Sequence, residues 1–341
     1  MTTKTVDWCL PQEFRLEGFQ SALVRWFAKE ARDLPWRRTK DPYHIWISEM
    51  MCQQTGVQTV VGYYQRFIEK FPDMGSLARA EPDEVLRLWE GLGYYSRARN
   101  IHRAAQILEY ERKGRWPKTR REILELPGIG AYSAGAILSI AFSRPEAALD
   151  GNVIRVLSRI FQVKEPVDQA QTLKRLWGMA QALVPKKSRW IRAHTEGMME
   201  LGARICLPRG GLCSRCPVSR HCLSAHQTEA KTLPRKTKPK KRVKLQESIF
   251  LLQRRAKIAV LAKGADPKYP LFYRLPFISG PYSPYERKMK YSITHRDIEV
   301  FVSRSLSLKS LQKKIKWVES DQLQAMSFPA IDRKVIQSLL V

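Results

Sequence analysis

Apolar residues recur at helical spacing along most of the chain. In "FQSALVRWFAKEAR", Phe19, Leu23 and Phe27 lie four residues apart with Ala22 and Trp26 beside them, so the five share one face of a helix. The segment "GNVIRVLSRIF" repeats this spacing. In "KDPYHIWISEMMCQQT", an Asp-Pro pair is a typical start signal, with Asp41 as the N-cap and Pro42 at the first helical position. The pattern predicts a mainly helical region over residues 14–230.

The last hundred residues have a different pattern. The segments "ESIFLLQR", "KIAVLAK" and "DIEVFVS" are short, rich in β-branched residues and bounded by turns, which is typical of strands. We expect a helix after Ser307, another at the C-terminus, and a small α+β domain over residues 245–341. Between the two regions, "KTLPRKTKPKKRVK" (231–244) holds eight basic residues, two prolines and no acidic residue. This composition predicts an extended linker.

The charge of the chain limits its function classes. Its 341 residues include 60 Lys and Arg against 32 Asp and Glu, a net charge of +28. That excess favours a polyanionic partner, nucleic acid before an acidic membrane surface. No apolar run approaches the roughly 20 residues of a membrane span, and the N-terminus has no secretory pattern. We expect a soluble, intracellular protein; the pattern favours a bacterial cytoplasm, with a nucleus or mitochondrion as the alternatives.

Four cysteines lie close together at spacing C-x6-C-x2-C-x5-C: Cys206, Cys213, Cys216 and Cys222. Disulfides are rare in cytosolic proteins, so the cluster indicates a metal centre. Structural zinc sites usually contain two C-x2-C pairs, and only one is present. The spacing therefore favours an iron–sulfur cluster held by four thiolates, with a zinc knuckle as the alternative.

The segment "LELPGIGAYSAGAIL" (124–138) predicts two helices joined by a tight turn. Leu126 and Pro127 would end the first helix, Gly128 and Gly130 would allow the turn, and "AYSAGAIL" would begin the second. Backbone N–H groups at such a helix start can bind an anion, and in a basic protein we expect a DNA phosphate. A purely structural corner is the alternative.

Two carboxylates are candidates for chemistry. Glu49 lies in the apolar helix "HIWISEMMCQQ", where burial would raise its pKa and keep it protonated as a proton donor. Asp150 precedes the helix of "LDGNV", where Asp is ordinarily an N-cap. Each has a bland explanation, an exposed helical Glu and a cap. Together they resemble the acid and the cation-stabilising or nucleophilic partner that cleavage of a glycosidic bond requires.

An enzyme that cleaves such a bond in DNA must extrude the base and fill the gap with a side chain. Tyr94 follows a glycine turn in "GLGYYSRARNIHRAA", and Gln54 lies at a helix end in "QQT". Without the neighbouring motifs, both would be interpreted as ordinary packing or surface residues.

Taken together, the motifs resemble the MutY family of adenine DNA glycosylases, within the helix-hairpin-helix, iron–sulfur superfamily. The resemblance covers most of residues 14–225, through "LPWR", "DPYHIWISEMMCQQT", "LWEGLGYYSRARNIHRAA", "LPGIGAYSAGAIL", "LDGNVIRVLSR" and the four cysteines. It implies a six-helix barrel with a helix-hairpin-helix, a cluster domain, and a monomer that acts on double-stranded DNA. The implied reaction is hydrolysis of the N-glycosidic bond of adenine mispaired with 8-oxoguanine or guanine.

The resemblance also implies residue roles. Glu49 would protonate N7 of the flipped adenine, Asp150 would stabilise or capture the sugar cation, and Asn152 would support the same site. Tyr132 stands where the endonuclease III family has its catalytic lysine, so base removal without strand cleavage is expected. Further roles are intercalation near 8-oxoguanine for Gln54 and Tyr94, phosphate contact for Arg209, and ligation of a [4Fe–4S] cluster for Cys206, Cys213, Cys216 and Cys222.

The C-terminal region resembles the family more weakly. In "YSITHRDIEVFV", Thr294 and His295 match residues that contact 8-oxoguanine, and Ile293 replaces an aromatic residue. The domain would be Nudix-like, but it lacks the G-x5-E-x7-R-E box, so we expect no nucleotide hydrolysis. Cys52 and Gly56 also replace residues common in the family, Leu and a longer polar residue.

Two other functions fit parts of the sequence. One is a related glycosylase for oxidised pyrimidines or for thymine in T:G mispairs, and Tyr132 argues against its lyase-type members. The other is a non-catalytic DNA-binding or iron–sulfur protein. Glu49 and Asp150, both in their expected contexts, argue against that second function.

Overall fold

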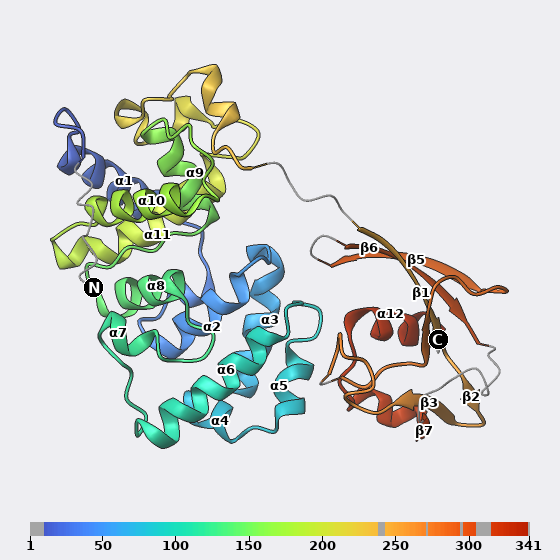
Figure 1. Ribbon diagram of the computed structural model, residues 1–341. Helices are drawn as coiled ribbons and strands as arrows, with labels where there is room; N and C mark the ends of the chain where they lie inside the picture. Colours follow the sequence, from blue (N-terminus) through green and yellow to red (C-terminus); the bar gives the residue numbers. More distant parts are fainter. Residues whose placement is uncertain (1–9, 238–242, 271, 294–295, 305–314, 340–341) are drawn as a thin grey trace. The chain divides into compact units, whose positions relative to one another are not determined.

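The structure is a computed structural model that describes residues 10–237, 243–270, 272–293, 296–304 and 315–339. It divides into two compact units, Met1–Arg79 with Asn100–Lys238, and Ala80–Arg99 with Pro239–Val341. The helices of the first unit are α1 (Leu16–Glu30), α2 (Pro42–Cys52), α3 (Val57–Lys70), α4 (Met74–Arg79), most of α6 (Ser96–Gln106), α7 (Arg120–Ile123), α8 (Ala131–Phe142), α9 (Gly151–Ile160), α10 (Ala170–Leu183) and α11 (Ser188–Arg204). Figure 1 shows helices up to the cysteine loop and strands from residue 243, so the predicted change from helices to strands is confirmed.

The apolar stripes form the core of the first unit. Phe19 and Leu23 of α1 are fully buried and pack in one cluster with Val156 and Leu157 of α9. Leu201 of α11 belongs to the same cluster. The core therefore fixes α9 against α11, and with it the start of α9 at Asp150.

Helix α2 begins where the sequence predicts. The Asp41 carboxylate accepts a hydrogen bond from the Tyr43 N–H at 2.8 Å, and Pro42 occupies the first helical position. Ile45 of α2 packs against Ala136 and Ile140 of α8. This contact holds two candidate site residues near each other, one on each helix.

The hairpin differs from the prediction at its first helix. Helix α7 ends at Ile123, and residues 124–130 form the turn, so Leu126 and Pro127 lie beyond the helix end. Gly128 has φ +78°, and a Cβ there would lie 2.6 Å from the Asn100 Cβ. Both the positive φ and the lack of space for a Cβ require glycine at position 128. The second helix, α8, begins at Ala131 as expected.

Gly135 lets α8 lie against the irregular segment that precedes α9 and contains Ala147. A Cβ at this position would lie 1.8 Å from the Ala147 carbonyl oxygen, which is backbone and cannot rotate away. We expect Gly135→Ala to destabilise the fold by more than about 3 kcal/mol, measured by urea unfolding. Gly62→Ala is the control because its Cβ would meet only the Arg66 side chain; it should gain roughly 0.5 kcal/mol from helix propensity. Equal effects would contradict this explanation.

The second unit contains α5 (Pro82–Leu88), two sheets and α12 (Ala330–Leu339). One sheet has the order β4-β1-β6-β5 and the other β2-β3-β7. The strands are β1 (Val243–Phe250), β2 (Gln253–Arg254), β3 (Lys257–Leu261), β4 (Phe277–Ser279), β5 (Arg287–Ile293), β6 (Arg296–Ser303) and β7 (Ile315–Glu319). Strands β1 and β6 pair in parallel, whereas the other pairs are antiparallel.

Apolar residues of both sheets and of α12 form the core of this unit. Ile249, Val260 and Val300 pack in one cluster with Ile331 and Val335. The strands expected in "KIAVLAK" and "DIEVFVS" and the C-terminal helix are confirmed. The strand expected in "ESIFLLQR" is interrupted, because β1 ends at Phe250 and β2 covers only Gln253–Arg254. The helix expected after Ser307 lies outside the described residues.

Arg274 is fully buried in the second unit. It pairs with Glu247 at 2.6 Å and Asp332 at 2.7 Å, and also with Asp266. Such a group is stable in the interior only because the charges are paired and hydrogen-bonded.

Among the described residues, no helix is both long and apolar enough to cross a membrane.

Candidate active site

Glu49, Tyr132, Asp150 and Asn152 line one pocket of the first unit. They come from α2, from the start of α8 and from the start of α9. The pocket volume is about 400 Å³, within the range of small-molecule sites and large enough for a nucleobase. Residues that are distant in the sequence are therefore brought together as the resemblance implies.

Glu49 is buried, with 9% of its surface exposed. The Tyr132 hydroxyl donates a hydrogen bond to its carboxylate. Burial raises the pKa of Glu49 to about 7, with a smaller upward contribution from Asp150, while the bond from Tyr132 opposes the rise. Near neutral pH the carboxyl group is therefore partly protonated, as a general acid must be.

Asp150 is both a helix cap and a wall of the pocket. One carboxylate oxygen accepts the Val153 N–H at 2.7 Å, and the other accepts the Asn152 side-chain amide at 2.9 Å. Burial raises the pKa of Asp150, while these donors favour the charged form. The cap thus holds a carboxylate in a fixed position beside Glu49.

Arg155 was not identified from the sequence. Its Nη2 donates to the Asn152 side-chain oxygen at 2.8 Å, and its Nε donates to the Cys206 carbonyl at 2.7 Å. Gly202 lets α11 lie close against Asn152, because a Cβ at position 202 would lie only 2.5 Å from the Asn152 Cβ. Arg155 therefore connects the Asp150–Asn152 pair to the start of the cysteine loop.

Four charged residues of the pocket wall were not identified from the sequence either, although Arg37 lies in the quoted "LPWR" motif. Arg32, Arg37, Glu196 and Glu200 line the same pocket. Burial alone would raise the pKa of Glu200, but hydrogen bonds from Arg32 at 2.7 Å and Arg37 at 2.9 Å lower it to about 2. Glu196, beside Arg192 at 3.1 Å, instead has its pKa raised by burial.

Glu200 holds the segment after α1 against α11. Glu200→Ala leaves Arg32 without its carboxylate partner and Arg37 with only Glu196 at 3.8 Å, so we expect a loss of about 3 kcal/mol in unfolding free energy. Asp33→Ala is the matched control because its pair with Arg38 is exposed on both sides. Denaturant unfolding of both variants tests this, and equal losses would contradict it.

A second groove opens beside the pocket. It is lined by Gln54, Gly128 and Gly130, and it shares Tyr132 and Asp150 with the pocket. Gln54 has φ +60° at the end of α2. The hairpin turn and Gln54 are thus brought to the edge of the candidate site.

The remaining predicted residues lie elsewhere. Tyr94 belongs to the second unit, on the turn after Gly93, and is 45% exposed. Arg209 is exposed on a turn between the first two clustered cysteines. Thr294 and His295 lie outside the described residues.

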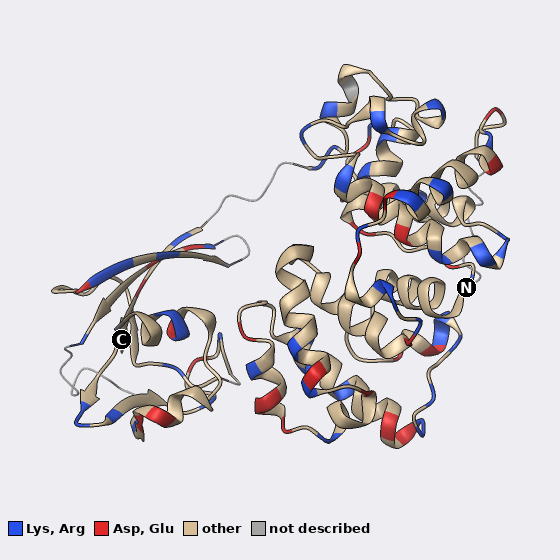
Figure 2. Ribbon diagram, turned by 180° about the vertical axis from the view of Figure 1, so that it is seen from behind, with Lys and Arg blue, Asp and Glu red and all other residues tan. Residues whose placement is uncertain are grey.

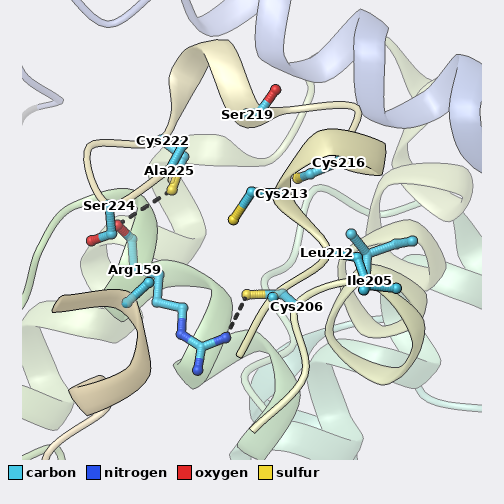
Figure 3. A pocket seen from close by; sticks show the side chains of 12 residues that line it. Arg159, Ile205, Cys206, Leu212, Cys213, Cys216, Ser219, Cys222, Ser224 and Ala225 are labelled. Atoms are coloured by element: carbon cyan, nitrogen blue, oxygen red, sulfur yellow. Dashed lines mark hydrogen bonds between the residues drawn. The ribbon is translucent and has the colours of Figure 1, made fainter. Parts of the chain in front are cut away.

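The four clustered cysteines line one cavity (Figure 3): Cys206, Cys213, Cys216 and Cys222. The buried Arg159 side chain donates to the Cys206 sulfur at 3.3 Å. Burial raises the pKa of Cys216 to about 12 and that of Cys222 to about 11. Among the described residues, no three His, Cys, Asp or Glu side chains converge on one ion. Four sulfurs around a common cavity, beside a guanidinium, are a donor set that fits a [4Fe–4S] cluster.

Residues 47–182 match the model of the HhH-GPD superfamily of base excision DNA repair proteins. A thymine-DNA glycosylase of Aeropyrum pernix is 34% identical over 211 residues, covering 61% of this chain and 95% of that protein. The chain belongs to the HhH-GPD superfamily. A solved structure of a thermostable thymine-DNA glycosylase agrees, with a TM-score of 0.55, 30% identity, and coverage of 62% of this chain and 96% of the other.

Other HhH-GPD relatives are adenine DNA glycosylases. The human protein of that name is 40% identical over 226 residues, which are 63% of this chain and 41% of the relative. The chain therefore spans less than half the length of the human relative. The resemblance to adenine DNA glycosylases is confirmed, and so is the helical fold of this superfamily.

Proposed function

We propose that the protein is a monofunctional DNA glycosylase that removes adenine from mispairs with 8-oxoguanine or guanine. The observation that carries the proposal is one pocket that holds a carboxyl group with a pKa near 7, Glu49, beside a hydrogen-bonded carboxylate, Asp150. Kinship to adenine DNA glycosylases supports adenine as the substrate. Double-stranded DNA is the proposed partner, consistent with the net charge of +28.

In this mechanism, Glu49 donates its proton to N7 of the extruded adenine. The glycosidic bond then breaks, its electron pair stays with the base, and the sugar becomes an oxocarbenium-like cation. The Asp150 carboxylate stabilises or captures that cation; water then supplies the hydroxyl group at C1′, and the proton that the water loses returns to the Glu49 carboxylate. Asn152 and the Val153 N–H hold Asp150 in place for this step.

The pocket also offers a basis for selecting adenine. Adenine presents an amino group and ring nitrogens on its edges, so it needs both an acceptor and a donor. Glu196 provides a buried carboxylate and Arg37 a guanidinium at the wall of the pocket. Both groups also have partners within the protein, Arg192 for Glu196 and Glu200 for Arg37, so contacts to the adenine edge would add to these pairs.

We infer that strand cleavage does not accompany excision. Tyr132 lies against Glu49, at the position where a lyase would need an amine to form a Schiff base. Its hydroxyl cannot form that adduct. Its role is to hold the Glu49 carboxyl group in the pocket.

We further infer a [4Fe–4S] cluster bound by Cys206, Cys213, Cys216 and Cys222. When bound, the cluster would organise the loop that carries the exposed Arg209, which we assign to phosphate contact. For the C-terminal region we propose a Nudix-like domain that reads 8-oxoguanine. Support comes from its two sheets and the packed helix α12.

A single-turnover assay tests the activity. Duplexes with one labelled adenine opposite 8-oxoguanine, guanine or thymine are quenched with and without hot alkali, beside a T:G duplex. We expect cleavage of the adenine strand only after alkali, fastest opposite 8-oxoguanine. Product at T:G instead would favour the thymine-directed function suggested by the Aeropyrum relative's name. Product without alkali would contradict the assignment of Tyr132.

A further inference from the structure

Residues 231–237, which follow the cysteine loop, are attached to the first unit along their length. The Val167 N–H donates to the Arg235 carbonyl at 2.9 Å, and the Arg159 Nε donates to the Leu233 carbonyl at 3.1 Å. The Thr237 N–H donates to Asp168 at 3.0 Å. Leu233 is 3% exposed. This part of the predicted linker is therefore fixed against the helical region.

Two lysines of this segment line the groove beside the active-site pocket. Lys231 and Lys236 lie on its wall, and the hairpin residues Gly128, Gly130 and Ala131 also line it. The groove also reaches Asp150, Asn152 and Tyr132. The two cavities share those three residues and therefore adjoin, so a DNA strand lying in the groove could place a nucleotide in the pocket.

The charges of these lysines are available to a ligand. Both side chains are exposed, and within the described part of the chain neither forms an ion pair. One acidic side chain, that of Asp168, interacts electrostatically with Lys236. Hydrogen bonds from Thr237 lower the pKa of Asp168 most, and Lys236 contributes less. Asp168 is therefore already engaged by Thr237, and the backbone bonds position the lysines before DNA arrives. Figure 2 shows Lys and Arg in both units.

We propose that Lys231 and Lys236 bind backbone phosphates of the DNA strand on either side of the extruded nucleotide. This rests on the proposed function only in naming the ligand as DNA. The segment acts as a preformed wall: its carbonyls and Thr237 anchor it, and its two lysines line the groove. Its contribution is to position the strand, while the chemistry stays with the pocket.

The first test measures how duplex binding depends on salt. Each phosphate contact contributes about 0.9 to the slope of log K against log salt concentration. Lys231→Ala/Lys236→Ala should lower the slope by about 2 on a duplex with one A:8-oxoguanine pair. Arg235→Ala is the control for either single lysine variant, each expected to lower the slope by about 1, because it removes one charge from the same segment at a residue that does not line the groove. An unchanged slope for the double variant, or a fall for Arg235→Ala equal to that of either single lysine variant, would overturn the proposal.

The second test locates the contact. Single methylphosphonate substitutions remove the charge of one phosphate at a time around the adenosine, and each should weaken binding by the parent protein where a lysine contacts it. In the double variant the penalty should vanish at one or two phosphates beside the adenosine. The same penalties at every position in both proteins would contradict the assignment. Both tests measure binding, so they remain decisive even if the parent excises no adenine, an outcome that would count against the proposed function alone.

Discussion

Glu49→Gln should retain binding to an A:8-oxoguanine duplex and lose excision by about 10²–10⁴-fold, the usual contribution of a general acid. The amide keeps the shape of the side chain and can still accept the Tyr132 hydrogen bond, but it carries no proton for N7. Single-turnover excision and a binding titration measure the two effects. Glu69→Gln, on the exposed face of α3, is the control and should behave as the parent. Unchanged excision by Glu49→Gln would remove Glu49 from the mechanism.

The same variant should be more stable than the parent at alkaline pH. Glu49 has its pKa raised from an ordinary 4.5 to about 7, so the folded state favours the protonated form. The contribution of this protonation to the free energy of unfolding is complete below pH 4.5 and is lost as pH rises through 7. Above pH 7 the buried anion costs about 3 kcal/mol, which the neutral amide avoids. Unfolding at pH 5 and pH 8 tests this, and excision by the parent should decline above pH 7 for the same reason.

The sequence predicts those parts of the site that depend on local order. Asp41 caps α2 because the cap and the helix are adjacent in the chain, and the apolar surroundings of Glu49 predict its burial directly. Asp150 shows the limit of this approach. Its position before a helix predicts a cap, and its place in the pocket follows only once α9 packs against α11.

The missed residues depend on long-range contacts. Glu200 lies 168 residues from its partner Arg32, and Arg155 lies 51 residues from the carbonyl that it binds. In the sequence each resembles an ordinary surface charge of an amphipathic helix. Arg274 is similar, since its burial depends on three carboxylates gathered by the sheets and α12. Only the fold shows that these charges are paired in the interior.

In the hairpin, the sequence predicts the motif and the start of α8 correctly but misplaces the end of α7. The Leu-Pro pair predicts a helix end, but the helix stops three residues before Leu126. The turn also needs Gly128 at φ +78° in close approach to Asn100, a contact that the pattern of the segment does not contain.

Asp150→Asn should lose excision by at least about 10²–10³-fold while keeping α9 intact, because it removes the negative charge that faces the sugar cation. Asparagine is as good an N-cap as aspartate, so its oxygen can still accept the Val153 N–H. Asp41→Asn is the matched control: it makes the same change at the cap of α2, outside the pocket.

Single-turnover excision should therefore separate the two variants, whereas thermal unfolding should not. Both should unfold within a few degrees of the parent, because both helices keep their caps. Only Asp150→Asn should lose excision, since only Asp150 lies beside Glu49 in the pocket. Equal excision by the two variants would reduce Asp150 to a structural cap. A large loss of stability in Asp150→Asn alone would instead mean that the hydrogen bond from Asn152 to the anion holds the start of α9.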